Sequence, residues 1–182
     1  MTYPGAGGDG RPQPLRRQLP AVTGPRHPVA IACLDLRSAF NTGSIFRTAD
    51  AARLAKVHLC GTTPFPPHDQ ITRTSRDTHK VVPWEYHADI LKLIAREKAQ
   101  GVTIIAVETG PESVPYDRAV YPMPVLLVLG NEARGLPPEV LAAADRVVSI
   151  PMLGAINSLN VAVAAGIVVY AAIRRPADED TK

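Results

Sequence analysis

The chain has 182 residues, of which 46% are apolar and 20% are charged, and its net charge is +3. This length suits one domain with a sizeable core and is short for two. The sequence has no run of about eighteen apolar residues, which excludes a membrane-spanning helix, and its start lacks the apolar segment of a secretory signal. We therefore expect a cytoplasmic protein with no membrane partner.

Residues 1–28 are rich in Gly, Pro and Arg and show no periodicity, so we predict a flexible basic arm there. The arm carries the whole surplus of positive charge, because the remaining residues are balanced in charge. Its basic residues are Arg11, Arg16, Arg17 and Arg26. Basic arms often contact nucleic acid, but a solubilising tail or a cloning remnant explains the charge equally well. A single domain is predicted over residues 29–175, followed by a polar tail at 176–182.

From residue 29, short apolar runs alternate with helical patterns, as parallel βα units do. Strands are predicted at 29–34, 57–61, 102–108, 125–130 and 147–152, and helices at 44–55, 88–100, from 137, and at 158–174. A proline-rich crossing at 111–124 separates the third strand from the fourth. Both of these strands are apolar on two faces, which is typical of central strands. The fold class is therefore α/β, a mostly parallel sheet with helices on both faces.

The two cysteines, Cys33 and Cys60, both lie in predicted strands and are expected to be buried thiols rather than a disulfide. The sequence has no CxxC motif, and its five histidines show no ligand spacing. We therefore predict no metal site.

Ligands of open α/β sheets bind beyond the carboxyl ends of the strands, so the segments after the strands are candidate sites. The first such segment holds Asn41 and Arg47. Asparagine is a good helix N-cap, so Asn41 fits that structural role equally well. For Arg47, the structural alternative is an ion pair with Asp50, three residues later in the predicted helix.

The second segment, Leu129–Leu136, places polar residues against the end of the most apolar strand, where desolvation is costly unless they are paired or in use. Its glycine spacing resembles a phosphate-binding loop, but Leu136 stands where that loop needs lysine. The structural alternative is a turn in which Glu132 and Arg134 form an ion pair.

The third segment, Ile150–Gly166, leads into the last helix. We expect Asn157 or Ser158 to cap this helix, which leaves Asn160 inside the first turn, where asparagine is a poor helix former. The small residues that follow are consistent with close packing or with a dimer face.

Together, NTGSIFRTA, VLGNEARGLP and SIPMLGAINSLNVAVA resemble the three motifs of the SpoU class of the SPOUT superfamily of RNA methyltransferases, over about residues 29–174. The stretch TTPFPPHDQITRTS is similar to the family's loop after the second strand. The resemblance implies a C-terminal trefoil knot and a homodimer with each active site at the subunit interface. It also implies transfer of a methyl group from S-adenosylmethionine to a ribose 2'-hydroxyl of RNA, with tRNA favoured over rRNA.

The resemblance assigns roles to residues of the three motifs. Cofactor contacts are expected from Thr109, Gly110, Leu129, Gly130, Asn131, Ile150, Met152, Ser158 and Leu159. Catalytic roles are expected for Arg47, Asn41, Glu132, Ser158 and Asn160. RNA contacts are expected from Arg47, Arg73, Arg76, Lys80 and Arg134, although a solvated surface strand is the ordinary interpretation of the stretch from Arg73 to Lys80. Arginine is a very weak base, so we expect Arg47 to clamp the substrate rather than to remove its proton.

Two other functions compete with the methyltransferase. A noncatalytic RNA-binding domain would keep the same fold without using the cofactor. A nicotinamide-dependent dehydrogenase would share the α/β order, but the segment after the first strand has a single glycine and lacks its glycine fingerprint.

Overall fold

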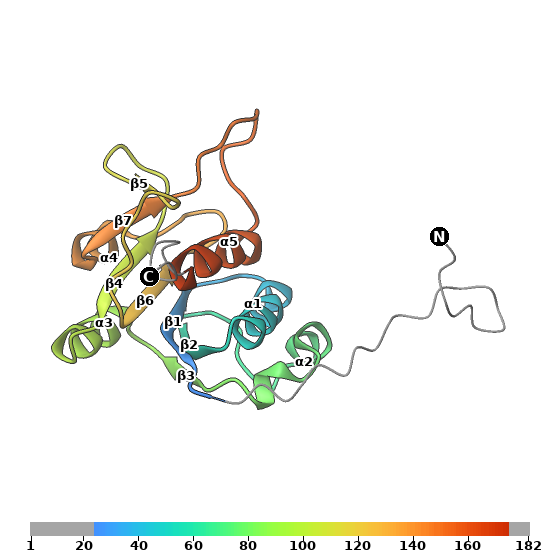
Figure 1. Cartoon of the computed structure of the whole chain (residues 1–182). Coiled ribbons are helices and arrows are strands. Elements are labelled where there is room, and N and C mark those ends of the chain that lie inside the picture. The colour runs from blue at the N-terminus through green and yellow to red at the C-terminus, as the bar shows by residue number, and fades with distance from the viewer. Residues whose placement is uncertain (1–23, 175–182) are drawn as a thin grey trace, which may run out of the picture.

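The computed structural model in Figure 1 describes residues 24–174, so the predictions for most of the arm and for the tail lie outside the described residues. Its centre is a seven-stranded sheet in the order β3-β2-β1-β6-β4-β7-β5, and every strand pair in it is parallel. The strands are β1 (His27–Leu34), β2 (Leu54–Cys60), β3 (Trp84–His87), β4 (Thr103–Val107), β5 (Val114–Pro115), β6 (Val125–Leu129) and β7 (Arg146–Ser149). The predicted α/β class with a mostly parallel sheet is confirmed.

Helices cover both faces of the sheet, as predicted. They are α1 (Ala39–Ala51), α2 (Asp69–Ser75), α3 (Ile90–Ala99), α4 (Pro138–Ala143) and α5 (Val161–Ile173), with a 3-10 turn, η1 (Thr78–Lys80). Residues of α1, α2 and α5 pack into the core on one face, and residues of α3 and α4 pack into the core on the other. All five residues of β6 are buried, which explains its continuous apolar sequence. Of the helices within residues 24–174, none combines the length and apolar character that crossing a bilayer requires.

The first strand starts two residues before the expected domain boundary at Val29. His27 is held by a hydrogen bond from its backbone N–H to the carbonyl of Arg53, at 2.8 Å. The Arg26 guanidinium donates to the carbonyls of Leu54 and Val81, both at 3.0 Å. The end of the predicted arm is therefore part of the fold, because its backbone and Arg26 bind the chain around β2.

The segment between β2 and β4 contains structure that the sequence did not predict: α2, η1 and β3. A surface strand at Arg73–Lys80 is wrong, since this stretch ends α2, passes through left-handed residues Arg76 and Asp77, and forms η1. Helix α2 lies directly against α1, and a Cβ added at Gly43 would be 2.8 Å from the Cβ of Thr74. The helical conformation of α2 is therefore accompanied by packing against α1, a contact that the local sequence does not reveal.

The two cysteines lie on neighbouring strands and are both buried with free thiols. Burial is the main cause that raises the pKa of Cys60 to about 12, and burial also raises the pKa of Cys33. Both thiols therefore stay protonated at neutral pH and behave as small apolar side chains.

The strands that carry the three motifs end at one edge of the sheet. The register pairs Cys33 with Leu129, Leu129 with Val107, and Val107 with Val148. The chain segments that follow β1, β4, β6 and β7 therefore start side by side. This confirms that the segments selected from the sequence converge at the carboxyl ends of the strands.

Candidate active site

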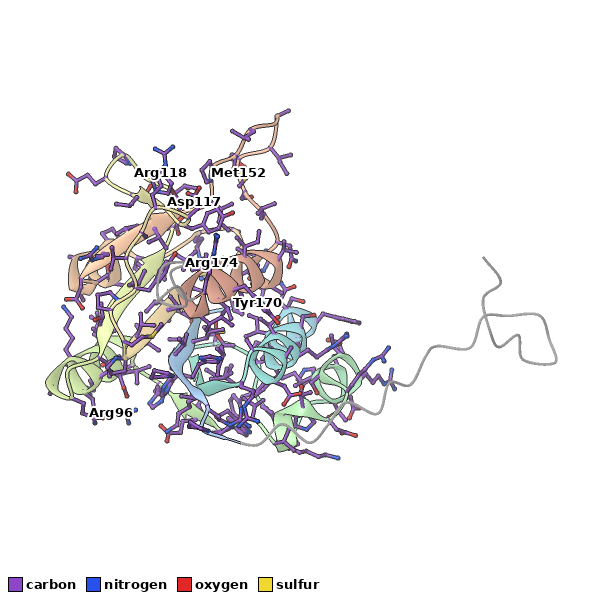
Figure 2. The ribbon with its side chains drawn as sticks, in the orientation of Figure 1. Arg96, Asp117, Arg118, Met152, Tyr170 and Arg174 are labelled. Atoms are coloured by element: carbon purple, nitrogen blue, oxygen red, sulfur yellow. The ribbon has the colours of Figure 1, made fainter. Side chains whose placement is uncertain are left out.

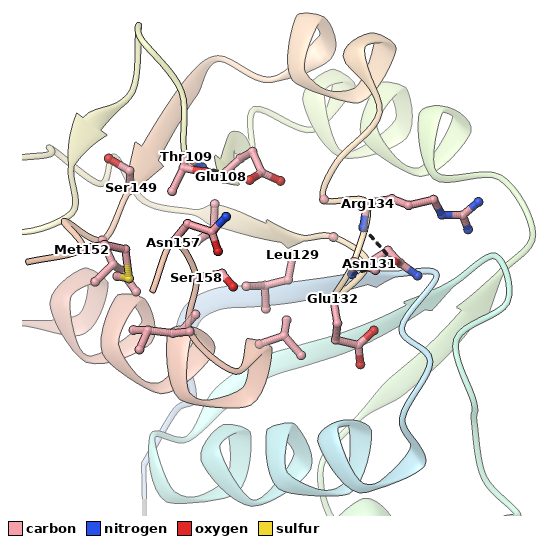
Figure 3. Close-up of a pocket in the computed structure, with 18 residues that line it drawn as sticks. Glu108, Thr109, Leu129, Asn131, Glu132, Arg134, Ser149, Met152, Asn157 and Ser158 are labelled. Carbon is pink, nitrogen blue, oxygen red and sulfur yellow. Dashed lines mark hydrogen bonds between the residues drawn. The ribbon is translucent and has the colours of Figure 1, made fainter. Parts of the chain in front are cut away.

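A cavity of about 450 Å³ lies at this edge of the sheet, between the segments that follow β4, β6 and β7 and the start of α5 (Figure 3). Small-molecule sites usually have volumes of about 300–1,000 Å³. Every residue predicted to contact the cofactor lines this cavity except Gly110. Of the predicted catalytic residues, Glu132 and Ser158 line it directly.

The loop after β6 is built on Asn131, which is only 7% exposed. Its Oδ1 accepts hydrogen bonds from the backbone N–H groups of Ala133 and Arg134, at 2.9 and 3.0 Å, and its Nδ2 donates to the carbonyl of Asp35 at 2.6 Å. Two backbone hydrogen bonds with Gly135 close the turn. Asn131 thus fixes the shape of the loop and joins it to the end of β1.

Glu132 does not pair with Arg134, so the expected structural ion pair is wrong. Its carboxylate instead accepts hydrogen bonds from the backbone N–H groups of Arg37 and Ser38, at 2.9 and 3.3 Å, and from Nδ2 of Asn41 at 2.8 Å. The carboxylate points towards α1 (Figure 3), and an anion at a helix N-terminus is favoured by the helix dipole. Glu132 therefore couples the loop after β6 to the start of α1.

The cap of the last helix differs from the prediction. Asn160, rather than Asn157 or Ser158, is the N-cap of α5, and its Oδ1 accepts from the backbone N–H groups of Ala162 and Val163, at 2.9 and 3.3 Å. Its Nδ2 donates to Oδ1 of Asn41 at 3.0 Å. Ser38, three residues before Asn41, is the N-cap of α1, so the capping alternative for Asn41 is also wrong.

Asn41, Glu132 and Asn160 thus form a hydrogen-bonded chain across three motifs that are 91 and 119 residues apart. Because Asn160 caps its helix through Oδ1, its Nδ2 is free to bind Asn41, and one side chain serves both roles. The structure therefore brings together three of the predicted catalytic residues. It does so beside the cavity, since Glu132 is part of the lining.

Arg47 lies elsewhere in this chain. It is exposed and lines a separate hollow of about 440 Å³ with Arg76 and Tyr170, and it does not line the cavity at the strand ends. No ion pair joins Arg47 to Asp50 or to any other residue within 24–174. The structure thus places Arg47 on α1 but outside the lining of the cavity to which Glu132 belongs.

The remaining predicted RNA-contacting residues are all exposed. Arg73 is in α2, Arg76 is the left-handed residue that ends it, and Lys80 is in η1, where it pairs with Asp77 at 3.0 Å. Arg134 is in the loop after β6 and is among the residues that line the cavity, and its side chain extends away from Asn157 and Ser158 (Figure 3). Arg76 and Arg47 share one hollow.

Glu108 is a cavity residue that the sequence analysis missed. Its Oε2 accepts from the backbone N–H of Leu136 at 2.9 Å, and its Oε1 accepts from the backbone N–H of Thr109 at 3.0 Å. It therefore joins the loop after β4 to the loop after β6. Its signal was present in the sequence, because Glu108 is a charged residue at the end of the apolar run that predicted a strand.

The network around Glu132 predicts a pH dependence of stability. Partial burial opposes ionisation of Glu132, but hydrogen bonds from Arg37, Asn41 and Ser38 outweigh it and lower the pKa below the ordinary value of 4.5. A carboxyl group whose pKa is lower in the folded state stabilises the fold above the unfolded pKa, and this contribution is lost as the pH falls through the folded value. We expect the wild type to lose more of its free energy of unfolding than Glu132→Gln between pH 7 and pH 3, measured by urea denaturation. Exposed Glu112→Gln is the matched control; an equal loss in all three proteins would contradict the assignment.

Comparison with known proteins agrees with the sequence motifs and the fold. The model of the SpoU rRNA Methylase family matches residues 28–170. The chain is 31% identical over 166 residues to a tRNA (guanosine(18)-2'-O)-methyltransferase of Thermus thermophilus, covering 91% of this chain and 84% of the relative. It is 30% identical over 151 residues to the enzyme of the same name from Escherichia coli K12, covering 82% of this chain and 65% of the relative.

Solved structures give the same result. The AdoMet-bound rRNA methyltransferase from Sinorhizobium meliloti is 32% identical, with a TM-score of 0.75 over 80% of this chain and 57% of that one. The A. aeolicus TrmH/SpoU tRNA modifying enzyme is 29% identical, with a TM-score of 0.74 over 81% of this chain and 75% of that one. From the fold, the convergent motifs and these matches, the chain belongs to the SpoU rRNA methylase family.

Proposed function

We propose that this chain is an S-adenosylmethionine-dependent RNA methyltransferase that modifies a ribose 2'-hydroxyl. The observation that carries the proposal is the cavity at the strand ends, which gathers the second and third motifs and is joined through Glu132 and Asn41 to the first. The relatives named above support it, since their names give tRNA guanosine 2'-O-methylation and one structure holds AdoMet. We favour tRNA as the substrate because the Thermus thermophilus tRNA enzyme matches at higher identity and over more of both chains than the 23S rRNA enzyme of Ralstonia nicotianae does.

The cavity fits the cofactor in size and chemistry. Leu129, Ile150 and Leu159 offer apolar surface for the adenine, and Thr109 and Ser158 bring hydroxyl groups. No hydrogen bond joins the Ser158 side chain to another residue of the described part, so its hydroxyl is available to a ligand. S-adenosylmethionine supplies a methyl group already activated on a sulfonium. The residues of this chain therefore need mainly to bind and orient the two reactants, and good positioning supplies much of the rate.

Arg47 is assigned the role of clamping the RNA beside the ribose. A guanidinium stays protonated under ordinary conditions, which suits it to bind a phosphate and disfavours it as a base. Arg76, which lines the same hollow, adds a second positive charge to this site. Asn41, Glu132 and Asn160 are positioning residues that hold the start of α1, the helix that carries Arg47.

The working unit in this proposal is a homodimer in which Arg47 of one subunit faces the cavity of the other. Support comes from the separation of Arg47 from the cavity within one chain. Support also comes from α5, where Val163 and Tyr170 are 51% and 53% exposed although the helix is almost wholly apolar. Tyr170 lies on α5 beside α1 (Figure 2) and lines the hollow that contains Arg47. An apolar stripe of this kind fits a subunit interface.

The RNA surface in this proposal extends from Arg47 and Arg76 to Arg73, Lys80 and Arg134. All five are exposed, and contacts of this kind with phosphates weaken as the salt concentration rises. The basic arm would add to this surface, and the activity would reside in the cytoplasm. We also assign a trefoil knot to the C-terminal part, in line with family membership and with a chain order that returns from edge strand β5 to β6 in the sheet interior.

The direct test is methyl transfer. We expect the protein to transfer labelled methyl from S-adenosylmethionine to unmodified tRNA transcripts, at one position that becomes resistant to alkaline cleavage because the 2'-hydroxyl is blocked. Calorimetry should give one cofactor site per chain. RNA binding without cofactor binding would instead support the noncatalytic RNA-binding function, and methylation of rRNA fragments alone would redirect the substrate.

A further inference from the structure

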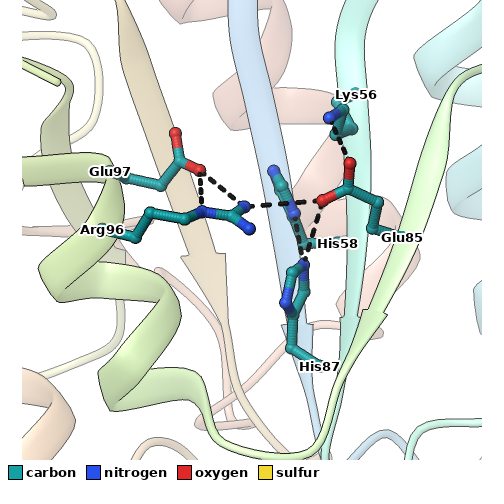
Figure 4. Close-up of polar contacts among 6 residues, drawn as sticks. All are labelled: Lys56, His58, Glu85, His87, Arg96 and Glu97. Atoms are coloured by element: carbon teal, nitrogen blue, oxygen red, sulfur yellow. Dashed lines mark hydrogen bonds and ion pairs between the residues drawn. The ribbon is translucent and has the colours of Figure 1, made fainter.

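Two neighbouring strands on the far side of β1 from the cavity carry a cluster of potential metal ligands. His58 is on β2, and Glu85 and His87 are on β3, where the register pairs His58 with Glu85 and Cys60 with His87. One ligand atom of each of the three side chains lies within 4.8 Å of the others (Figure 4). None of them lines the cavity at the strand ends, so the cluster is separate from the proposed active site.

We propose that His58, Glu85 and His87 bind one divalent transition-metal ion of the zinc class. Two imidazole nitrogens and a carboxylate oxygen are a donor set that zinc accepts in tetrahedral coordination, with a water molecule as the fourth ligand. Mg²⁺ and Ca²⁺ prefer oxygen donors alone, so this set discriminates against them.

The interatomic distances suit this geometry. Nδ1 of His58 lies 2.9 Å from Nε2 of His87, and Oε2 of Glu85 lies 3.5 Å from the same Nε2. Ligand atoms bound at about 2.0 Å to a tetrahedral ion are separated by about 3.3 Å. Small movements suffice for the two histidines, and Glu85, whose side chain is 42% exposed, has room to approach His58.

Burial disfavours the charged form of both histidines. Burial is the main cause that lowers the pKa of His58 to about 3, followed by the neighbouring His87. Burial also lowers the pKa of His87, and the Arg96 charge adds to the effect. Because the facing nitrogens are 2.9 Å apart, one of them donates to the other, so one ring changes its tautomer when both bind an ion.

The surrounding charges hold the carboxylate in place. Lys56 binds the other oxygen of Glu85, Oε1, at 2.6 Å, and hydrogen bonding of a ligating carboxylate from outside is a common feature of metal sites. Arg96 lies 3.4 Å from Oε2 and would have to give up this contact, but it keeps Glu97 at 2.9 Å. Apart from the two histidines, the charged side chains here are those of Glu85, Glu97, Lys56 and Arg96. Their charges cancel, so no net positive charge repels the ion.

The ion would pin the edge strand β3 to β2. Another cavity, also of about 440 Å³ and distinct from the hollow that contains Arg47, is lined by His58 and Glu85 and has room for a water molecule as the fourth ligand. The chain between the two strands, residues 61–83, contains α2 and η1, and this segment carries Arg73, Arg76 and Lys80. Metal binding would thus stabilise the base of the segment that carries the proposed RNA-contacting residues.

Calorimetric titration of the untagged, chelator-treated chain with zinc sulfate tests the proposal. We expect one zinc ion per chain, with affinity at least about tenfold lower in His87→Gln and in Glu85→Gln. His27→Gln, which changes an exposed histidine outside the cluster, is the matched control and should bind as the wild type does. Absence of zinc binding by the wild type, or equal affinity in His87→Gln, would overturn the proposal.

Two readouts on the wild type avoid the risk that a variant fails to fold. Cobalt chloride should give the intense visible absorption of a four-coordinate site, and zinc should raise the melting temperature by about 5 °C at a hundred times its dissociation constant, whereas magnesium should not. A weak, octahedral cobalt spectrum together with an unchanged melting temperature would show that the cluster is a hydrogen-bonded and ion-paired group only.

Discussion

Replacement of Arg47 by alanine is expected to reduce methyl transfer to tRNA by about a hundredfold to a thousandfold, while the dissociation constant for S-adenosylmethionine stays within about twofold of the wild type. The reason is that Arg47 does not line the cavity, so its loss leaves the proposed cofactor site intact and removes only the charge that holds the RNA. Single-turnover transfer of labelled methyl, with calorimetry on the same protein, measures both quantities. Arg47→Lys keeps the charge without the planar guanidinium and should recover only part of the rate.

A mixing experiment separates action within a chain from action across the dimer. Arg47→Ala subunits have an intact cavity, and Gly130→Ala subunits keep Arg47 but are expected to have a damaged cavity. If Arg47 serves the partner's cavity, an equal mixture of inactive variants should regain about a quarter of wild-type activity, since half the dimers are mixed and each has one complete site. No recovery in mixtures shown to exchange subunits, or full activity of Arg47→Ala alone, would contradict the role given to Arg47.

The sheet and the position of the cavity were predictable because each rests on a local signal. Continuous apolar runs such as Val125–Leu129 predicted buried strands, and polar residues directly after them marked the loops that gather at the strand ends. Asn131 illustrates why this works, since a polar side chain that is 7% exposed at the end of a buried strand must be fully hydrogen-bonded. The same rule would have found Glu108.

The helix caps were not predictable, because the choice among neighbouring capping residues depends on distant partners. Ser158 and Asn160 are both good N-caps, and the structure uses Asn160, whose Nδ2 at the same time reaches Asn41 on another helix. Likewise Glu132 binds the start of α1 rather than the nearby Arg134. In each case the spacing in the sequence favoured a residue close by in the chain. The observed partner is distant in the chain and is brought close by the register of the sheet.

The segment from residue 61 to residue 87 was the hardest to predict for the same reason. Helix α2 has seven residues and lies against Gly43 of α1, a contact that no periodicity within seven residues reveals. His58 and His87 are 29 residues apart and meet only because β2 and β3 pair. The prediction of no metal site rested on the spacing of ligands within the sequence. That criterion does not detect a cluster whose members are brought together by strand pairing.

The largest effect on both stability and binding is expected for Gly130→Ala. A Cβ at Gly130 would lie 2.5 and 2.6 Å from the carbonyl carbon and oxygen of Gly135 and 2.7 Å from the backbone nitrogen of Leu136. These are backbone atoms that cannot rotate away, so the loop itself would have to move. The Gly135 carbonyl accepts from Asn131, and the Leu136 N–H donates to Glu108, so the movement would break the hydrogen bonds that close the loop and join it to β4.

We expect Gly130→Ala to lower the free energy of unfolding by about 2–4 kcal/mol and to weaken S-adenosylmethionine binding at least about tenfold. Gly154→Ala is the matched control, because a Cβ there meets no atom within 4 Å. Urea denaturation followed by circular dichroism and calorimetric titration with the cofactor measure the two effects. Because the cavity wall is made of the same two backbone segments that pack at Gly130, both effects should appear together. A variant that is destabilised yet binds the cofactor normally would place the cofactor outside this cavity.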